Sequence, residues 1–171
     1  MKGRPQKGEV ADYYFTYIDK VGDGDIVSTL EAQLQRGLAL FAGISEQASR
    51  HRYAPDKWSI RQVLNHINDA ERVFAFRALW FARGLPEALP SFDQDITSAA
   101  AHADECAWRD HVDEFRVIRL ASIALLRNLP DDAWLKRGIA SGNAVSVRGL
   151  AYIIAGHTEH HLGVLNERYL Q

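Results

Sequence analysis

Four long segments of the chain repeat apolar residues with the period of an α-helix, and this pattern limits the possible folds more than any other feature. The segments cover about residues 26–44, 59–84, 104–128 and 146–169. No segment of comparable length alternates between apolar and polar residues, as a half-buried strand would. We therefore expect an all-α protein in which each helix buries one apolar stripe.

Local signals support these boundaries and suggest how the helices are connected. Ser59 followed by Gln62 is typical of a capping box, and Gly84 is a natural stop for the helix that begins there. Four helices of about 20 residues predict a four-helix bundle, and the connection at residues 84–97 is long enough for a crossover. We expect residues 129–145 to form a loop, while residues 10–20 fit either a helical turn or an extended arm.

Composition narrows the class of protein. A chain of 171 residues can form one domain over residues 1–171 with its own core. The formal net charge of −2 gives no basic surface for nucleic acid or for an anionic membrane. No apolar run is long enough to span a membrane, and no secretory signal is visible. With Cys106 as the single cysteine, these features favour a cytoplasmic protein.

Histidines concentrate in the last helical segment, in the stretch AGHTEHHLGVL at residues 155–165. His157 and His161 fall on the apolar stripe, one helical turn apart, which is a spacing that presents two ligands to one metal ion. The alternative is a pair of core histidines hydrogen-bonded to carbonyls or carboxylates. His160, three residues after His157, could replace His161 as a ligand, although it lies nearer the edge of the stripe.

A third histidine favours the metal interpretation. His66 lies at the edge of the core stripe of the second segment, and bundle sites are built from inward-facing side chains on neighbouring helices. Three buried imidazoles without a metal or partner would each cost about 1–3 kcal/mol. A three-histidine site suits a divalent transition metal, with zinc or nickel favoured and iron, manganese or copper also compatible. We also expect the second nitrogen of each ring to bond to an acceptor.

The remaining histidines are expected to be solvated or locally hydrogen-bonded. They are His51, His102 and His111.

Two motifs resemble the signature regions of the DinB-like (YfiT-like) superfamily of four-helix-bundle proteins. These are KWSIRQVLNHINDAERVFAFRAL in the second segment and GHTEHHLGVL in the last. The resemblance implies that His66, His157 and His161 bind a divalent metal with one position left to water, and that the protein forms a homodimer. It does not imply DNA polymerase activity.

The same resemblance suggests two classes of function. The first is a metal-dependent enzyme of the thiol S-transferase or hydrolase type acting on a small molecule, possibly with a low-molecular-weight thiol. The second is a non-catalytic metal-binding protein of a stress response or an interaction module. A substrate-sized pocket beside an open metal position would favour the enzyme, and a closed site would favour the binding protein.

Several other residues are candidates for roles around this site. Asp69 and Glu159 are the available carboxylates, Arg72 and Arg77 could position an anionic substrate, and His160, Tyr53 and Trp58 could line the pocket. Each has a plainer alternative, because helix charges usually face solvent and Trp58 could belong to the core.

Overall fold

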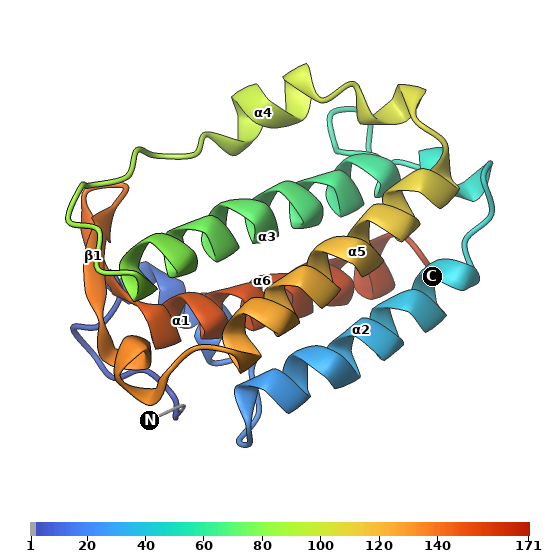
Figure 1. Cartoon of the computed structure of the whole chain (residues 1–171). Coiled ribbons are helices and arrows are strands. Elements are labelled where there is room, and N and C mark those ends of the chain that lie inside the picture. The colour runs from blue at the N-terminus through green and yellow to red at the C-terminus, as the bar shows by residue number, and fades with distance from the viewer. Residues whose placement is uncertain (1–2) are drawn as a thin grey trace.

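The computed structural model describes residues 3–171, and its architecture is a bundle of four long helices (Figure 1). The helices are α2 (Ile26–Ala42), α3 (Ile60–Ala82), α5 (Trp108–Arg127) and α6 (Val147–Arg168). Each occupies one of the four periodic segments, so the predicted helical bundle is confirmed. Short 3-10 helices cover Asp12–Tyr14, Ala48–Arg50, Ala103–Glu105 and Asp131–Leu135.

The start of α3 shows why the chain becomes helical at this point. The Ser59 hydroxyl accepts a hydrogen bond from the backbone N–H of Gln62 at 3.1 Å, and the Gln62 side chain accepts one from the Ser59 N–H at 3.0 Å. This reciprocal pair is the predicted capping box, and it satisfies two N–H groups that have no partner within the helix. The helix ends before Gly84, whose φ of +80° is readily adopted by glycine.

The order of the helices around the bundle requires a long connection. Helices α2 and α3 do not neighbour each other; each packs against both α5 and α6. Figure 1 shows α3 and α5 running side by side in the same direction, opposite to α2 and α6. Parallel neighbours need a connection that returns along the whole bundle, and residues 83–107, which contain α4 (Gln94–Ala100), make this crossover. It is longer than the predicted residues 84–97, because the next long helix begins at Trp108 and not at about residue 104.

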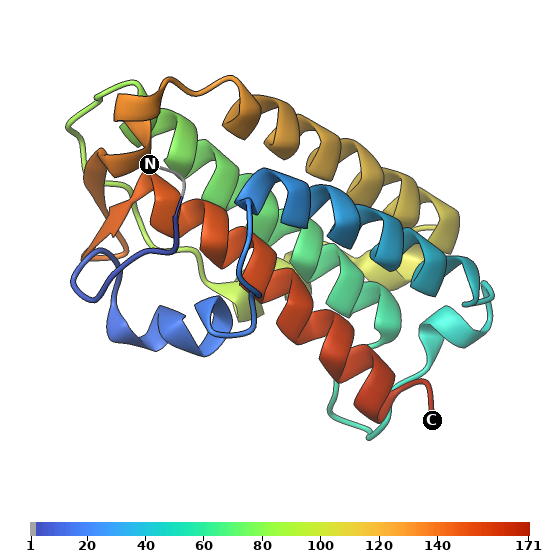
Figure 2. The same ribbon diagram turned by 90° about the horizontal axis from the view of Figure 1, so that it is seen from below.

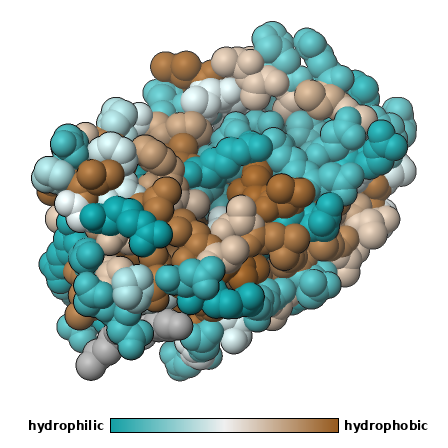
Figure 3. Space-filling model, viewed as in Figure 1, coloured by the Kyte–Doolittle hydropathy of each residue, from teal (hydrophilic) through white to brown (hydrophobic). Residues whose placement is uncertain are grey.

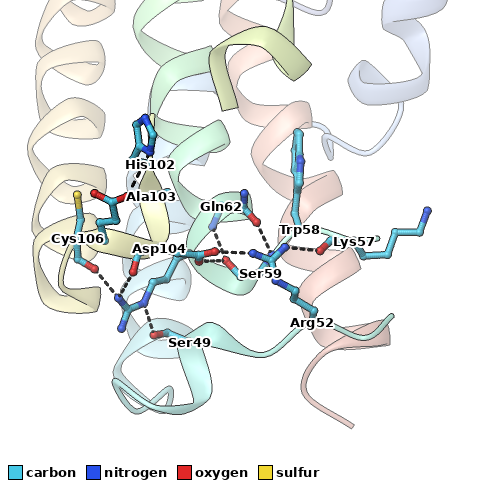
Figure 4. Close-up of polar contacts among 12 residues, drawn as sticks. Ser49, Arg52, Lys57, Trp58, Ser59, Gln62, His102, Ala103, Asp104 and Cys106 are labelled. Atoms are coloured by element: carbon cyan, nitrogen blue, oxygen red, sulfur yellow. Dashed lines mark hydrogen bonds and ion pairs between the residues drawn. The ribbon is translucent and has the colours of Figure 1, made fainter. Parts of the chain in front are cut away.

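The end of the crossover is fixed to the start of α3 by a polar cluster (Figure 4). The Asp104 carboxylate accepts hydrogen bonds from the Ser59 hydroxyl and the Arg52 guanidinium. The buried Arg61 guanidinium donates to the Cys106 carbonyl. The crossover is therefore held against α3, the helix that carries His66.

Residues 129–145, expected to form a loop, contain most of a β-hairpin. Strand β1 (Arg137–Ala140) pairs antiparallel with β2 (Asn143–Ser146), and Ser141 and Gly142 form the turn with φ of 53° and 74°. Leu89 of the crossover hydrogen-bonds to the outer edge of β1. The hairpin was not predicted because four-residue strands are too short to show a clear alternation of apolar and polar residues. In addition, β1 pairs with a segment that lies about 50 residues earlier in the sequence.

Residues 10–20, left open between helix and arm, are partly helical. A single helical turn, α1 (Phe15–Ile18), packs against α6 (Figures 1 and 2). Gly156 of α6 permits this contact, because a Cβ atom there would lie 2.2 Å from the Tyr17 carbonyl oxygen. The N-terminal half of α6 is consequently buried on all sides, and every residue from 147 to 158 is buried.

A buried polar network joins all four long helices near the middle of the bundle. Arg119 of α5 pairs with Glu71 of α3 through contacts of 2.8–3.0 Å. The same guanidinium donates to Gln33 of α2 and to Thr158 of α6. These contacts compensate the burial of the arginine charge and fix the helices relative to one another.

The outer face of α3 and α5 carries exposed apolar side chains, which Figure 3 shows gathered near its centre. They include Phe76 and Leu79 of α3 and Val117 of α5. The homodimer implied by the resemblance stays a prediction. Within the described residues, no helix combines the length and the apolar character needed to cross a membrane. The expected cytoplasmic location also stays a prediction.

Candidate metal centre

Three histidine side chains converge between α3 and α6. The Nε2 atom of His157 lies 3.0 Å from Nε2 of His66 and 3.2 Å from Nε2 of His161. One nitrogen from each ring lies within 4.8 Å of the other two. The helical period thus places His157 and His161 one turn apart on α6, and the packing of α3 brings His66 to the same point.

This donor set fits a divalent transition metal. An ion bound to imidazole nitrogens at about 2.0–2.1 Å in tetrahedral geometry separates those nitrogens by about 3.3–3.4 Å. The two observed separations, 3.0 and 3.2 Å, lie within a few tenths of an ångström of that value. Among residues 3–171, no further histidine, cysteine, aspartate or glutamate joins the group. A metal held here by the protein would keep at least one coordination position open.

Burial keeps these three histidines in the neutral form that a metal requires. It lowers the pKa of His66 to about 4 and, together with the neighbouring histidines, lowers the pKa of His161 to about 3. Burial also lowers the pKa of His157 well below its ordinary value, and the adjacent His161 and His66 act in the same direction. At neutral pH all three rings can therefore offer a lone pair.

Aromatic contacts surround the three rings. The Trp58 ring lies 5.1 Å from His66, and the Tyr17 ring packs edge-on at 5.4 Å from His157. The expected acceptors for the second ring nitrogens stay a prediction, since the contacts described at these rings join their Nε2 atoms to one another. Packing between flat rings restricts their rotation.

His160 lies beside the cluster without belonging to it. Its ring is 4.9 Å from His161 and 5.4 Å from Tyr17, both measured between ring centres. The group of converging nitrogens contains His161 and excludes His160. The structure thus places His160 next to the ligand candidates, in the wall of a surface hollow.

A cavity of about 240 Å³ opens beside His66 and His157. Aromatic side chains form much of its wall, and Gln94 of the crossover, Ser141 of the hairpin turn and Arg77 add polar groups. The aromatic residues are Tyr13, Tyr14, Tyr17, Phe74 and Phe92. Sequence reasoning did not assign the aromatic residues or Gln94 to the site; the only signal was the run of tyrosines in residues 10–20.

A second hollow, of about 330 Å³, lies on the other side of the cluster next to His160 and His161. Tyr53 and Trp58, the expected pocket residues, both line it. Asp95 of α4 also lines this hollow, and its negative charge acts on His66. Asp95 was not among the carboxylates considered from the sequence, because its position depends on how the crossover lies over α3.

The two carboxylates considered from the sequence lie outside both hollows. Glu159 accepts hydrogen bonds from Gln33 and Arg36 of α2, so it turns away from the histidines. Asp69 accepts from Asn65 at 2.9 Å, and burial raises its pKa.

Arg72 and the remaining histidines have the plainer roles that were considered for them. Arg72 is exposed and pairs with Glu114, outside the cavity beside the cluster. Among the remaining histidines, His51 and His102 are exposed. The buried His111 hydrogen-bonds through Nε2 to the Ala103 carbonyl at 2.9 Å, as expected for a locally bonded side chain.

The fold and the cluster together define the class: a four-helix bundle with a three-histidine site suited to a divalent metal. Comparison with protein families agrees, since the model of the DinB superfamily matches residues 29–165. The chain therefore belongs to the DinB superfamily, and the resemblance noted from its motifs is confirmed.

A solved structure shares the fold of this chain. YfiT from Bacillus subtilis, described as a probable metal-dependent hydrolase with an unusual four-helix bundle topology, matches with a TM-score of 0.68. The match covers 95% of this chain and 89% of YfiT, at 15% sequence identity. At that identity the comparison establishes the fold alone. A search of curated proteins finds no match.

Proposed function

We propose that the protein is a metal-dependent enzyme acting on a small molecule, with His66, His157 and His161 as the metal ligands. The observation that carries this proposal is the convergence of three neutral imidazoles at the wall of a cavity, with no fourth protein ligand among the described residues. A purely structural metal is usually enclosed by four protein ligands, whereas a catalytic one keeps an open position. The cavity supplies room for a substrate next to that position.

Zinc and nickel are the ions that we favour for this donor set, with iron, manganese and copper also compatible. When bound, a divalent ion acts as a Lewis acid that activates water or a thiol as a nucleophile. The protein contributes the neutral imidazoles, the aromatic walls that restrict water, and Asp95 as a carboxylate close enough to act on His66. We assign Asp95, in place of Asp69 or Glu159, as the candidate proton acceptor.

Two reaction types remain within this proposal, and each has its own support. Hydrolysis accords with the description of YfiT. Thiol transfer accords with the wall of the 240 Å³ cavity, where the described residues include no carboxylate, because Asp95 lines the other hollow. A thiol, with a pKa of about 8.5, ionises more readily than water and needs less help from a base. A non-catalytic metal-binding role in a stress response is the alternative, and it predicts metal without turnover.

Replacing each histidine in turn tests the metal site. We expect His66→Ala, His157→Ala and His161→Ala to lose most of the metal, because two imidazoles hold a divalent ion much more weakly than three. The loss in affinity should exceed the roughly 10–100-fold caused by changing a residue that only supports a ligand. Elemental analysis of protein purified without added metal measures this directly.

His160→Ala is the matched control, because it removes a histidine one residue from a ligand candidate. It should retain its metal. Loss of metal from His160→Ala with retention in His161→Ala would contradict the ligand assignment. Unchanged metal content in all four variants would contradict the site itself.

A further inference from the structure

Arg77 is a buried arginine without the glutamate partner that the other buried arginines have. Four arginine side chains are buried, and three of them pair with a glutamate. The pairs are Arg61–Glu46, Arg119–Glu71 and Arg148–Glu9. The fourth, Arg77, is 4% exposed, and within residues 3–171 no carboxylate pairs with it. Burying a charge without a counter-charge is costly, so this position calls for a negative group.

The protein groups that contact Arg77 are neutral, and they leave some of its hydrogen-bond donors unused. Its Nη2 donates to the Pro90 carbonyl at 2.7 Å and to the Ser141 hydroxyl at 3.0 Å. The Tyr14 hydroxyl also interacts with the guanidinium, and burial lowers the pKa of Arg77. A guanidinium has five N–H donors, so these three oxygens leave donors for a ligand.

Arg77 shares a cavity with the histidine cluster. It lines the 240 Å³ cavity together with His66 and His157, and none of the described residues that line this cavity is acidic. Phe74 lies between the two ends: its ring centre is 6.0 Å from the Arg77 Cζ atom and 5.9 Å from the His157 ring centre. A molecule lying along Phe74 could contact Arg77 at one end and face the cluster at the other.

We propose that Arg77 binds the carboxylate of a small substrate with an apolar or aromatic body, whose reacting end faces the histidine cluster. The role of the reacting end rests on the proposed metal-dependent function, whereas the carboxylate site does not require a metal. An arginine matches the two oxygens of a carboxylate with parallel hydrogen bonds. The aromatic walls would contact the body of the substrate.

The volume of the cavity and the single positive charge in its wall favour a small carboxylate over other anions. The cavity is smaller than the roughly 300–1,000 Å³ typical of sites for drug-sized ligands. Arg77 is the single arginine or lysine in the cavity wall. One cation balances one carboxylate, whereas a phosphate group would bring a charge of about −1.5 to −2.

Binding of benzoate and of its neutral analogue benzamide to the metal-free protein tests the site. Ligand-observed NMR titration should show benzoate binding at least about tenfold more tightly than benzamide, since a charge-assisted hydrogen bond is lost with the amide. Arg77→Met should abolish this preference. Arg72→Met is the matched control, because it removes an exposed arginine from the same helix, and it should keep the preference.

Three results of this titration would decide whether Arg77 forms a carboxylate site. Equal binding of the two ligands by the unaltered protein, or no binding of benzoate, would overturn it without relying on any variant. A folded Arg77→Met protein, checked by circular dichroism, that still prefers benzoate would also overturn it. A preference for benzoate in a protein whose histidines bind no metal would support the carboxylate site and contradict only the metal-dependent function.

Discussion

At the scale of single residues, burial and charge decide what each titratable group does. Glu9, from the N-terminal segment, accepts hydrogen bonds from Ser146 and from the Arg148 guanidinium at the start of α6. The contact with Arg148 is the main reason that the pKa of Glu9 falls to about 2. The ordinary pKa of a glutamate in an unfolded chain is about 4.3. The folded state therefore holds the charged form of Glu9 more strongly than the unfolded state does.

Glu9→Gln should lower the free energy of unfolding at pH 7 by about 3 kcal/mol, because it leaves Arg148 buried without its counter-charge. The pKa in the folded state is depressed, so the ion pair contributes fully above about pH 4.5 and is lost as the pH falls toward 2. Urea denaturation between pH 7 and pH 3 should show the difference between the two proteins shrinking as the pH falls. A difference independent of pH would contradict this account.

At the scale of elements, small residues set how closely segments approach. Gly156 lies where α1 packs on α6, and a Cβ atom there would meet the backbone of Tyr17. Backbone atoms cannot move aside as the end of a flexible side chain can. The contact matters for the site, because Tyr17 packs on His157 and lines the cavity.

Gly156→Ala should destabilise the fold by about 1–3 kcal/mol, because α1 must shift away from α6. Gly163→Ala provides the comparison on the same helix, since no atom lies within 4 Å of its added Cβ. That change should stabilise the protein by up to about 1 kcal/mol through helix propensity. Chemical denaturation of both variants measures the effects, and equal stabilisation by both would show that α1 does not pack as described.

At the scale of the whole molecule, the histidine cluster joins two helices that are remote in the sequence. His66 comes from α3, and His157 and His161 come from α6. The cluster lies where two apolar clusters meet, one around the first half of α6 and the other around its second half. A ligand bound there would favour the folded state over the unfolded state, in which these residues are separated.

If the cluster binds a metal as proposed, removing that metal should lower the melting temperature of the unaltered protein. A metal at 100 times its dissociation constant adds about 2.7 kcal/mol, which corresponds to a rise of several degrees for a domain of this size. Differential scanning fluorimetry with a chelator, and then with added zinc or nickel, measures the change. His161→Ala should show no such response, and an equal response in both proteins would place the metal elsewhere.

The sequence by itself determined the four long helices, most of their ends, and the pairing of His157 with His161. These features are local, because a period of 3.6 residues orients side chains around their own helix axis and a cap such as Ser59–Gln62 acts within one turn. The length of the connection at residues 84–97 also indicated a crossover. The position of His66 at the edge of its own helical stripe, together with the family motifs, indicated the third ligand.

Only the tertiary structure decided how those faces meet. Arg72 and Arg77 lie five residues apart on α3, yet Arg72 faces solvent while Arg77 is buried beside the cluster. Glu159 turns to α2, and Asp95 reaches the site through the crossover. The hairpin depends on Leu89, and the aromatic wall depends on α1 packing at Gly156. Each of these outcomes depends on contacts between segments far apart in the sequence, which no local periodicity specifies.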